Sequence, residues 1–493
     1  MILNYAEFKD KVNACWIGKN IGGTMGTPYE GRREMQDIKG FVTKPGEVLP
    51  NDDLDLQLVW LMALEQIGPL NVNAATLGEY WVSFITPHWN EYGIGKCNLK
   101  RGLQAPLAGD YLNHWKNSNG AWIRTEIWAS VAPGLPAAAA KYAIEDAKVD
   151  HGAGEGTYAA AFVAAMQSAA FIISDIRKCI EIGLTAIPES SRMAKSIRFL
   201  FECYEKGMDY REARNAVQQL NADIGDGWFE APSNVSYAVI GLLWGEGDFK
   251  KTMIYAINCG DDTDCTGATV GATMGILNGM AGIPTDWKEY LGDEIITLSL
   301  ARGNNARGLP ANCSILTDRV VKIAPSVLFA NRVYGEIDIS EVKATELPDN
   351  VEEILFNGAK RANQEFNKLK PYMTHFTGVI FDVDVTLPNG PDIEPNGSVP
   401  VTVDISNNTH WSRHENSPYN LSLRWMLPDG FTLEGGKRAV YLDEASPHDK
   451  APCSTVNVKI NAGEKVEAVN RIVLEIVADG RPTAVYVPVV LLG

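Results

Sequence analysis

Glycines recur every fourth residue through a stretch that carries almost no charge, from Gly260 to Pro284. It opens with three carboxylates, Asp261, Asp262 and Asp264, and some twenty uncharged residues follow. Its glycines share one helical face: Gly267, Gly271, Gly275 and Gly279. Since glycine inside a helix costs roughly 1 kcal/mol against alanine, this face indicates that something approaches the backbone closely. The pattern predicts a buried central helix whose first turn favours anions.

A second glycine-faced helix is expected near the start of the chain. Its apolar stripe begins after Tyr5, and its end, GKNIGGTMGTPYEG, again spaces small residues by four. The two glycine-faced helices could pack against each other at short backbone separation, or each could pack on something else. Pro28 ends the first helix and presents Glu30 just beyond it.

The stretch PNDDLDLQLVWLMALEQIG predicts a third helix, capped by Asn51 or Asp52. A cap needs one polar residue, yet four occur in five positions: Asn51, Asp52, Asp53 and Asp55. Adjacent carboxylates repel one another, and either a cation or plain solvent would relieve that repulsion.

Between Trp89 and Ala160 the chain is rich in Gly, Pro, Asn and aromatic residues, which favours a set of binding loops over filler, although structured packing loops have the same composition. Several aromatic side chains could stack on a planar ring or a sugar, although each alone is more often part of a core: Trp89, Tyr92, Trp122 and Trp128. His151 precedes another small-residue helix, and a lone histidine is usually structural.

Near residue 325 the pattern changes to alternating apolar and polar positions with Asp-Gly turns. The fold class expected is therefore multidomain: an all-α domain over residues 1–325, a connector with one helix over 326–370, and an immunoglobulin-like β-sandwich over 371–493. The sandwich could be a packing or dimerising module. It could also contact ligand if it folds back over the helices, through His410, Trp411 and His414.

Composition narrows the function without defining it. The 493 residues are 45% hydrophobic and 21% charged, and the net charge of -17 argues against nucleic acid or anionic membranes as partners. The glycine-rich segment is too poor in leucine and isoleucine for a membrane span. Eight scattered cysteines and no signal-peptide core favour a cytoplasmic protein, or a secreted or periplasmic one if a leader was trimmed.

The two acidic turns, near Asp52 and near Asp262, lie roughly 210 residues apart, each at the start of a predicted helix. If those helices are neighbours, four or five carboxylate oxygens converge, which suits Mg²⁺, Mn²⁺ or Ca²⁺. Zinc is disfavoured because no His or Cys spacing resembles a zinc site. The residues alone predict a carboxylate metal site in a helical domain.

At these positions the chain resembles the ADP-ribosylglycohydrolase family, which includes the dinitrogenase reductase-activating glycohydrolase. The resemblance covers about residues 5–300. It rests on GTMGTPYEG, on NDDL in place of a TDDT-like motif, on NGAWIR (Asn119 to Arg124), on His151 before a helix, and on DDTDCTGATVGATMG.

The resemblance implies an all-α fold with a dinuclear Mg²⁺ centre. Metal-binding positions of the family match Asn51, Asp52, Asp53, Asp262, Asp264 and Cys265. The resemblance further implies catalytic roles for Glu30, Asp53 and Asp262. Substrate binding is expected at Asn119, Arg124, His151, Trp89 and Tyr92. Two departures matter: Asn51 and Leu54 replace threonines, and Cys265 stands where a threonine ligand is usual, although a thiol binds Mg²⁺ poorly.

We expect a metal-dependent hydrolase of glycosidic bonds that acts on an N- or O-linkage at an ADP-ribosyl, ribose-like anomeric carbon. One alternative is a hydrolase of small carbohydrate or nucleoside glycosides. Another alternative is a non-catalytic member of the family that binds ADP-ribose or has a structural role. The partner expected is a small molecule or an ADP-ribosylated substrate, and a homo-oligomer is possible.

Overall fold

The computed structural model describes residues 1–224, 229–300, 308–408, 418–444 and 451–493. They fall into two compact units. The first unit comprises residues 1–96 and 113–368 and is helical, whereas the second comprises 97–112 and 369–493 and is built mainly of strands. The expected order of an α domain followed by a β domain is confirmed. The residues assigned to a connector, 326–370, contain the end of α16 (Cys313–Ala330), the short strand β2 (Asp338–Ser340) and α17 (Val351–Phe366). All of them up to residue 368 belong to the helical unit.

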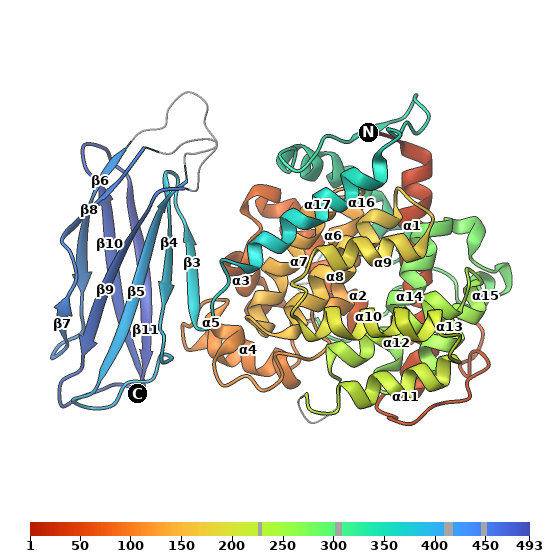
Figure 1. Ribbon diagram of the computed structural model, residues 1–493, viewed down its shortest axis with the longest axis horizontal. Coiled ribbons are helices and arrows are strands. Elements are labelled where there is room, and N and C mark those ends of the chain that lie inside the picture. The colour runs from red at the N-terminus through yellow and green to blue at the C-terminus, as the bar shows by residue number, and fades with distance from the viewer. Residues whose placement is uncertain (225–228, 301–307, 409–417, 445–450) are drawn as a thin grey trace. The chain divides into compact units, whose positions relative to one another are not determined.

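Helices build the first unit almost entirely (Figure 1). A single parallel pair joins the short strands β1 (Ile2–Asn4) and β2 (Asp338–Ser340). The helices run in this order: α1 (Tyr5–Gly26), α2 (Asp52–Ile67), α3 (Ala74–Phe84), α4 (Asn90–Lys100), α6 (Glu126–Val131), α7 (Pro136–His151), α8 (Glu155–Ala170), α9 (Ile176–Thr185), α10 (Arg192–Glu205), α11 (Tyr210–Leu220), α12 (Ala231–Trp244), α13 (Phe249–Asn258), α14 (Thr263–Asn278), α15 (Thr285–Leu291), α16 (Cys313–Ala330) and α17 (Val351–Phe366).

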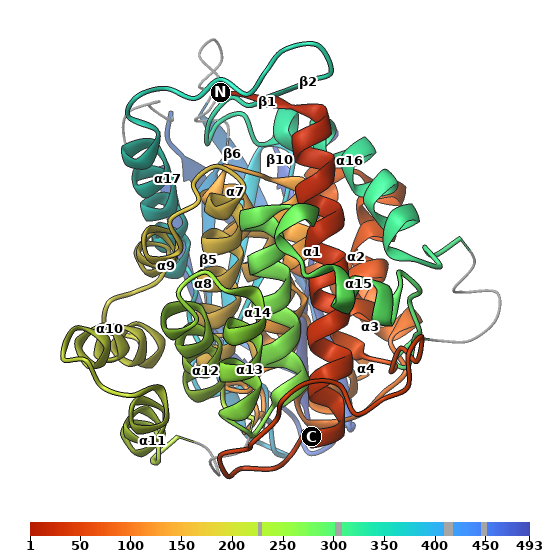
Figure 2. The same ribbon diagram turned by 90° about the vertical axis from the view of Figure 1, so that its right-hand side faces the viewer.

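The two glycine-faced helices pack against each other, as one of the two alternatives held. Figure 2 shows α1 and α14 side by side. A Cβ atom on Gly22 would lie 2.0 Å from the carbonyl oxygen of Gly267, and one on Gly18 would lie 2.1 Å from that of Gly271. Only glycine permits so short a separation. The glycines spaced every four residues in α1 and α14 therefore form a continuous line of backbone-to-backbone contacts between the two helices.

Helix α2 begins as expected. Asn51 is its N-cap, and the Asn51 side chain accepts a hydrogen bond of 2.7 Å from the backbone N–H of Asp53. Nearly the whole helix is buried, which explains why its hydrophobic residues surround it instead of forming a narrow stripe.

The expectation of binding loops between Trp89 and Ala160 was wrong for much of that stretch. Residues 90–100, 126–131 and 136–151 are helical, and α8 starts at 155. The alanines of α7 and α8 allow close helix packing in a core, so tertiary contacts outweighed the glycine, proline and asparagine signals. Trp122 and Trp128 are completely buried and serve that core.

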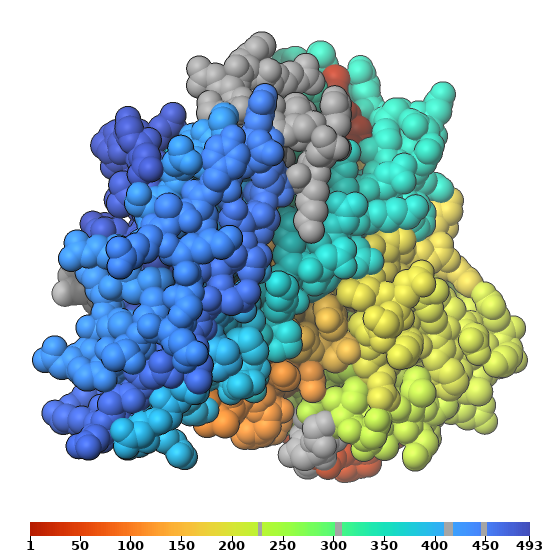
Figure 3. All heavy atoms as spheres, turned by 60° about the vertical axis from the view of Figure 1, so that its left-hand side comes forward, coloured from red at the N-terminus to blue at the C-terminus, as the bar shows by residue number. Residues whose placement is uncertain are grey.

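The strand unit contains two antiparallel sheets, one with the order β11-β10-β6-β8 and the other with β3-β4-β5-β9-β7. Figure 3 shows its surface in blue. The strands are β3 (Met373–Thr377), β4 (Phe381–Thr386), β5 (Ser398–Asn407), β6 (Tyr419–Met426), β7 (Thr432–Gly435), β8 (Ala439–Leu442), β9 (Cys453–Asn461), β10 (Val469–Ala478) and β11 (Ala484–Leu492), with a short helix α5 (Leu107–Asp110) from the inserted segment. Alternate strand residues fill one core, as in a β-sandwich.

Two further expectations bear on this architecture. His410, Trp411 and His414 lie outside the described residues. Across the described ranges, no helix is long and apolar enough to cross a membrane.

Candidate functional site

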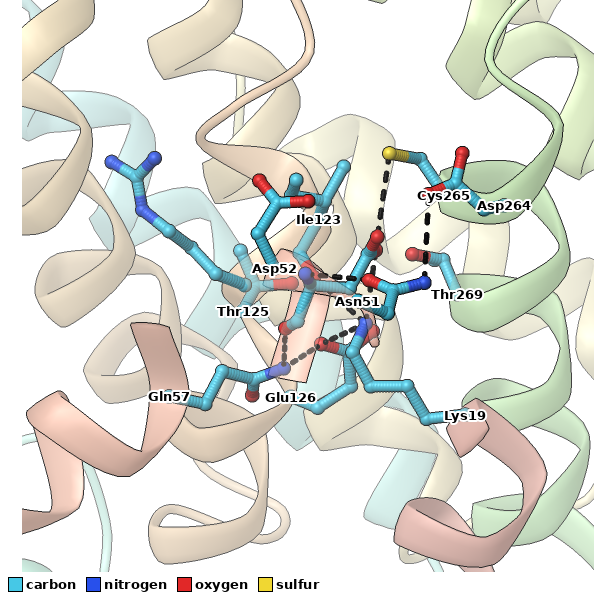
Figure 4. Close-up of polar contacts among 12 residues, drawn as sticks. Lys19, Asn51, Asp52, Gln57, Ile123, Thr125, Glu126, Asp264, Cys265 and Thr269 are labelled. Atoms are coloured by element: carbon cyan, nitrogen blue, oxygen red, sulfur yellow. Dashed lines mark hydrogen bonds and ion pairs between the residues drawn. The ribbon is translucent and has the colours of Figure 1, made fainter. Parts of the chain in front are cut away.

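Three segments that are far apart in sequence meet at one place in the helical unit. Oxygen atoms of Glu30, Asp262 and Asp264 lie within 4.8 Å of one another. A second group, made by Asp53, Asp264 and Cys265, is equally tight and shares Asp264 with the first. The predicted convergence of the acidic turns of α2 and α14 is therefore confirmed. Figure 4 shows Asp264 and Cys265 of the second group with neighbouring residues such as Asn51 and Lys19.

The backbone holds the Glu30 segment against the start of α14. The N–H of Gly31 donates to the carbonyl of Asp261 over 2.8 Å, and the N–H of Asp261 donates to the carbonyl of Arg32 over 2.6 Å. Asp261 adopts a left-handed backbone conformation with φ of 63°, and its carboxylate accepts a 2.8 Å bond from the Asn234 amide. Asp261 therefore shapes the turn, while Asp262 and Asp264 face the cluster.

The carboxylates of Asp262 and Asp264 are each held on one side only. Asn119 Nδ2 donates to Asp262 Oδ2 over 2.6 Å, and Asn51 Nδ2 lies 3.5 Å from Asp264 Oδ2. The Oδ1 atoms of both aspartates are buried and have no hydrogen-bond donor among the described residues. Buried polar atoms are rarely left without a partner. Two such oxygens beside Glu30 are the arrangement that a hard divalent cation would complete.

Burial and mutual repulsion both disfavour the charged form of the clustered carboxylates. Burial, followed by repulsion from Glu30, raises the pKa of Asp262 and of Asp264 well above the ordinary carboxyl value. Partial desolvation, followed by the charge of Asp52, raises the pKa of Glu30. The donor set is almost entirely carboxylate oxygen, so these residues fit Mg²⁺, Mn²⁺ or Ca²⁺.

Asp53 lies in a different environment from Asp262 and Asp264. Its Oδ1 is 3.4 Å from the Nζ of Lys19, and its Oδ2 is 3.4 Å from the Sγ of Cys265. Burial raises the pKa of Asp53 to about 7, although the charge of Lys19 opposes this shift. Burial likewise raises the pKa of the Cys265 thiol well above its usual value, so the sulfur keeps its proton and acts as a donor.

Lys19 and Glu126 form part of the site that the sequence analysis missed. Lys19 is 1% exposed, and its ammonium lies 3.1 Å from Glu126 Oε2 and donates to the carbonyl of Ile123 over 2.7 Å. Gln57 donates to the same Glu126 oxygen over 2.9 Å. A lysine inside the otherwise uncharged GKNIGG segment was the available signal, because a buried lysine requires a partner.

The rim of the site carries two aromatic residues predicted to bind substrate. Tyr92 is buried and donates its hydroxyl to Asp52 Oδ2 over 2.9 Å. Trp89 stacks on Tyr92 with ring centroids 6.4 Å apart, and Trp89 is 48% exposed. This pair connects an open aromatic surface to a carboxylate of the α2 turn. Trp89 is thus placed where a planar ligand could stack.

Arg124 and His151, also predicted to bind substrate, have no exposed surface. The guanidinium of Arg124 pairs with Asp146 at 3.0 Å and with Asp150 at 2.8 Å. The ring of His151 bonds Asp150 through Nδ1 over 2.9 Å. Because both side chains are buried and bonded to aspartates, their positions do not favour direct contact with a substrate.

This buried network continues towards the carboxylate cluster. His151 Nε2 lies 3.4 Å from the hydroxyl of Ser118, the residue next to Asn119. Asn119 also accepts a 2.9 Å bond from the indole of Trp122, which fixes the amide that donates to Asp262. The NGAWIR motif therefore holds the Asp262 side chain of the site in place through Asn119.

Another group that could hold a metal ion, Glu91, Asp150 and His151, lies within this buried network, where Asp150 is already bonded by Arg124 and His151.

Comparison with known proteins adds the family. The family model described as ADP-ribosylglycohydrolase matches residues 4–312, and no curated protein matches the chain. Among solved structures, an ADP-ribosylglycohydrolase-related protein complex is 19% identical, with 65% of this chain and 98% of that chain covered and a TM-score of 0.40.

Two solved structures resemble a smaller part of the chain. One is a FixG-related protein from Vibrio parahaemolyticus, 8% identical, which covers 23% of this chain and 94% of its own at a TM-score of 0.18. The other is the GAE domain of GGA2p from Saccharomyces cerevisiae, which is 11% identical. This match covers 24% of this chain and 96% of the GAE domain, at a TM-score of 0.17. With scores this low, the assignment rests on the family model.

The class that the fold and the site define is a helical protein with a buried carboxylate cluster at the starts of two helices. The family model matches more than half of the 493 residues, so the chain belongs to the ADP-ribosylglycohydrolase family. Hydrolysis of glycosidic bonds is the activity of that family in general.

Proposed function

We propose that this protein is a metal-dependent hydrolase that cleaves an N- or O-glycosidic bond at an ADP-ribosyl, ribose-like anomeric carbon. The observation that carries the proposal is the pair of buried Oδ1 atoms of Asp262 and Asp264, which lack donors and lie beside Glu30. Asp261 Oδ1 also lacks a partner, but Asp262 and Asp264 differ from Asp261 because their carboxylate oxygens converge with that of Glu30 within 4.8 Å.

Glu30, Asp262 and Asp264 would hold the cation, and the sequence-derived ligand set adds Asn51, Asp52, Asp53 and Cys265 around it. A divalent cation bound there would draw in sugar hydroxyls and make a water molecule more acidic. Asn119 and Asn51 fix the aspartates by holding the opposite oxygens. The carboxylates therefore need little reorganisation when a ligand arrives.

Proton transfer is the part assigned to Glu30. Its side chain is exposed at the rim, whereas Asp262 and Asp264 are buried, so it can reach both substrate and solvent. A carboxyl group with a raised pKa is better matched to accept and return a proton near neutral pH. Asp53, predicted to be catalytic, is engaged by Lys19 and Cys265, and we assign it a positioning part instead.

Trp89 would hold the planar or apolar face of the substrate, because it is the exposed member of the aromatic pair beside Asp52. An aromatic face accepts a nucleobase and a sugar ring alike. This surface therefore also supports the second candidate function, hydrolysis of a small carbohydrate or nucleoside glycoside.

The decisive experiment measures hydrolysis of a panel that contains ADP-ribosylated peptides, ADP-ribosyl O-glycosides, nucleosides and simple glycosides. Each substrate is assayed with Mg²⁺, Mn²⁺ or Ca²⁺, with chelator, and in Asp262→Asn and Asp264→Asn. We expect turnover of an ADP-ribosyl substrate that chelator and both substitutions abolish. Turnover of simple glycosides alone would favour the second candidate. Tight ADP-ribose binding without metal and without turnover on the whole panel would identify a non-catalytic member.

A further inference from the structure

A lysine side chain contacts Asp53, which the family resemblance assigns to the dinuclear metal centre. Lys19 extends from α1, and its ammonium lies 3.4 Å from Asp53 Oδ1, 3.1 Å from Glu126 Oε2 and 2.7 Å from the carbonyl oxygen of Ile123. Figure 4 shows Lys19 with Glu126 and Ile123. Neither carboxylate is more than 1% exposed on its side chain. Lys19 therefore supplies a fixed positive charge inside the protein, in contact with a residue expected to bind metal.

The two clusters that share Asp264 differ in the hydrogen-bond donors that face their carboxylate oxygens. In the group of Asp53, Asp264 and Cys265, donors already face the carboxylates: the ammonium of Lys19 and the thiol of Cys265 face Asp53, and the Asn51 amide lies 3.5 Å from Asp264 Oδ2. In the group of Glu30, Asp262 and Asp264, the Oδ1 atoms of both aspartates are buried without any donor among the described residues. Asp264, with its Oδ1, is common to both groups, so the groups differ in their other aspartate. Both oxygens of Asp53 face a donor, whereas Asp262 Oδ1 faces none among the described residues.

Charge and ligand chemistry point the same way. A divalent cation beside Asp53 would stand next to the ammonium of Lys19 in a buried setting, where like charges repel strongly. It would also have to take the sulfur of Cys265 in place of an oxygen, and thiols bind Mg²⁺ poorly. The ammonium and the thiol proton together satisfy both oxygens of Asp53 without any metal.

We infer that this protein binds one divalent cation, at Glu30, Asp262 and Asp264, and that the ammonium of Lys19 takes the charge-neutralising place of a second metal beside Asp53. The inference rests on the proposed function for the existence of the first metal. It departs from the dinuclear centre that the family resemblance implies. It makes Lys19 a positioning residue that fixes Asp53 and sets the metal count.

The experiment counts bound Mn²⁺ in the full-length chain by equilibrium dialysis and records the electron paramagnetic resonance spectrum. Three proteins are compared: the wild type, Cys265→Thr, which restores an oxygen ligand, and Lys19→Met combined with Cys265→Thr. We expect one equivalent with the spectrum of an isolated ion in the first two. The double variant is expected to bind a second equivalent and to show an exchange-coupled spectrum.

Two equivalents in the wild type would overturn the inference while leaving a metal-dependent hydrolase intact. A folded double variant that stays at one equivalent would overturn the part assigned to Lys19. No bound Mn²⁺ in any protein would overturn this inference and the proposed metal together. Should the double variant fail to fold, crystals of the wild type soaked in MnCl₂ decide: one anomalous peak beside Glu30 supports the inference, and a second beside Asp53 contradicts it.

Discussion

Gly22 of α1 and Gly267 of α14 meet so closely that a Cβ atom on Gly22 would lie 2.0 Å from the carbonyl oxygen of Gly267. This contact fixes the helix whose first turn carries Asp262 and Asp264 against the helix that ends before Glu30. The distance between the two glycines therefore governs the distance between the carboxylates of the site.

Gly22→Ala is expected to destabilise the fold, because the added methyl group would force two backbones apart. Overpacking of this kind typically costs about 1–3 kcal/mol, and here the obstacle is backbone, which moves least easily. Denaturant unfolding measures the change. Gly40→Ala is the matched control, because a Cβ there meets nothing within 4 Å, and it should be neutral or slightly stabilising. Equal stability of the two variants would contradict the packing described.

Asp264→Asn should abolish stabilisation by Mg²⁺ without lowering the melting temperature of the metal-free protein. The substitution removes one of several buried carboxylates that repel one another. Substituting a residue that hydrogen-bonds a metal ligand typically lowers metal affinity by roughly 10- to 100-fold, and substituting the ligand Asp264 itself should lower it further. Thermal melting with and without Mg²⁺ is the measurement. Asp261→Asn is the control, because Asp261 shapes the turn and should leave the Mg²⁺ response in place.

Stability of the metal-free protein should fall as pH rises from about 4 to about 7. The Asp53 carboxyl loses its proton near pH 4 when unfolded, but burial raises its pKa to about 7 when folded. Across this window the folded state holds a proton that the unfolded state has lost, so rising pH favours unfolding. Melting temperatures in chelator at pH 5, 6, 7 and 8 test this slope.

Added Mg²⁺ should oppose that decline, since a cation replaces protons on the cluster. The stabilising effect of Mg²⁺ should therefore be larger at pH 8 than at pH 5. The apparent affinity for Mg²⁺ should fall about tenfold for each pH unit by which pH is lowered, for each proton displaced. A Mg²⁺ effect that is independent of pH would contradict the assignment of raised pKa values to metal-binding carboxylates.

Trp89→Ala should raise KM about tenfold while kcat and the melting temperature change little. Trp89 is 48% exposed, so its loss removes stacking on the substrate and leaves the core unaffected. Trp89→Phe should recover most of the affinity. Tyr441→Ala removes an aromatic residue that is 54% exposed in the strand unit and should change neither constant. An unchanged KM in Trp89→Ala would exclude the proposed binding surface.

Arg124→Ala should lower the free energy of unfolding by about 3–5 kcal/mol, because Asp146 and Asp150 would stay buried after losing the guanidinium that pairs with both. Arg124→Lys should restore only part of this, since a point charge cannot form both paired contacts. The exposed pair of Arg198 with Glu189 supplies the control, where Arg198→Ala should cost no more than about 1 kcal/mol. Denaturant midpoints compare the three variants.

Local signals account for what the sequence predicted correctly. Asn51 at the start of α2, the glycine repeats of α1 and α14, and the alternating strands after residue 370 are each defined by neighbours a few residues away. Caps, helical faces and strand alternation depend on such short-range geometry. The acidic turns near Asp52 and Asp262 could be recognised in the sequence because they too are short local patterns at predicted helix starts.

Tertiary packing decided the rest. Whether the two glycine faces met each other, whether residues 90–100 formed a helix, and whether Arg124 and His151 faced solvent all depended on contacts across more than a hundred residues or on burial. The sequence by itself determined which residues could serve a cation site and which helices would carry them. Only the folded chain determined that Lys19 neutralises Asp53 while Asp262 and Asp264 keep unpaired oxygens, because charge balance in a buried site is set by distances that no local pattern encodes.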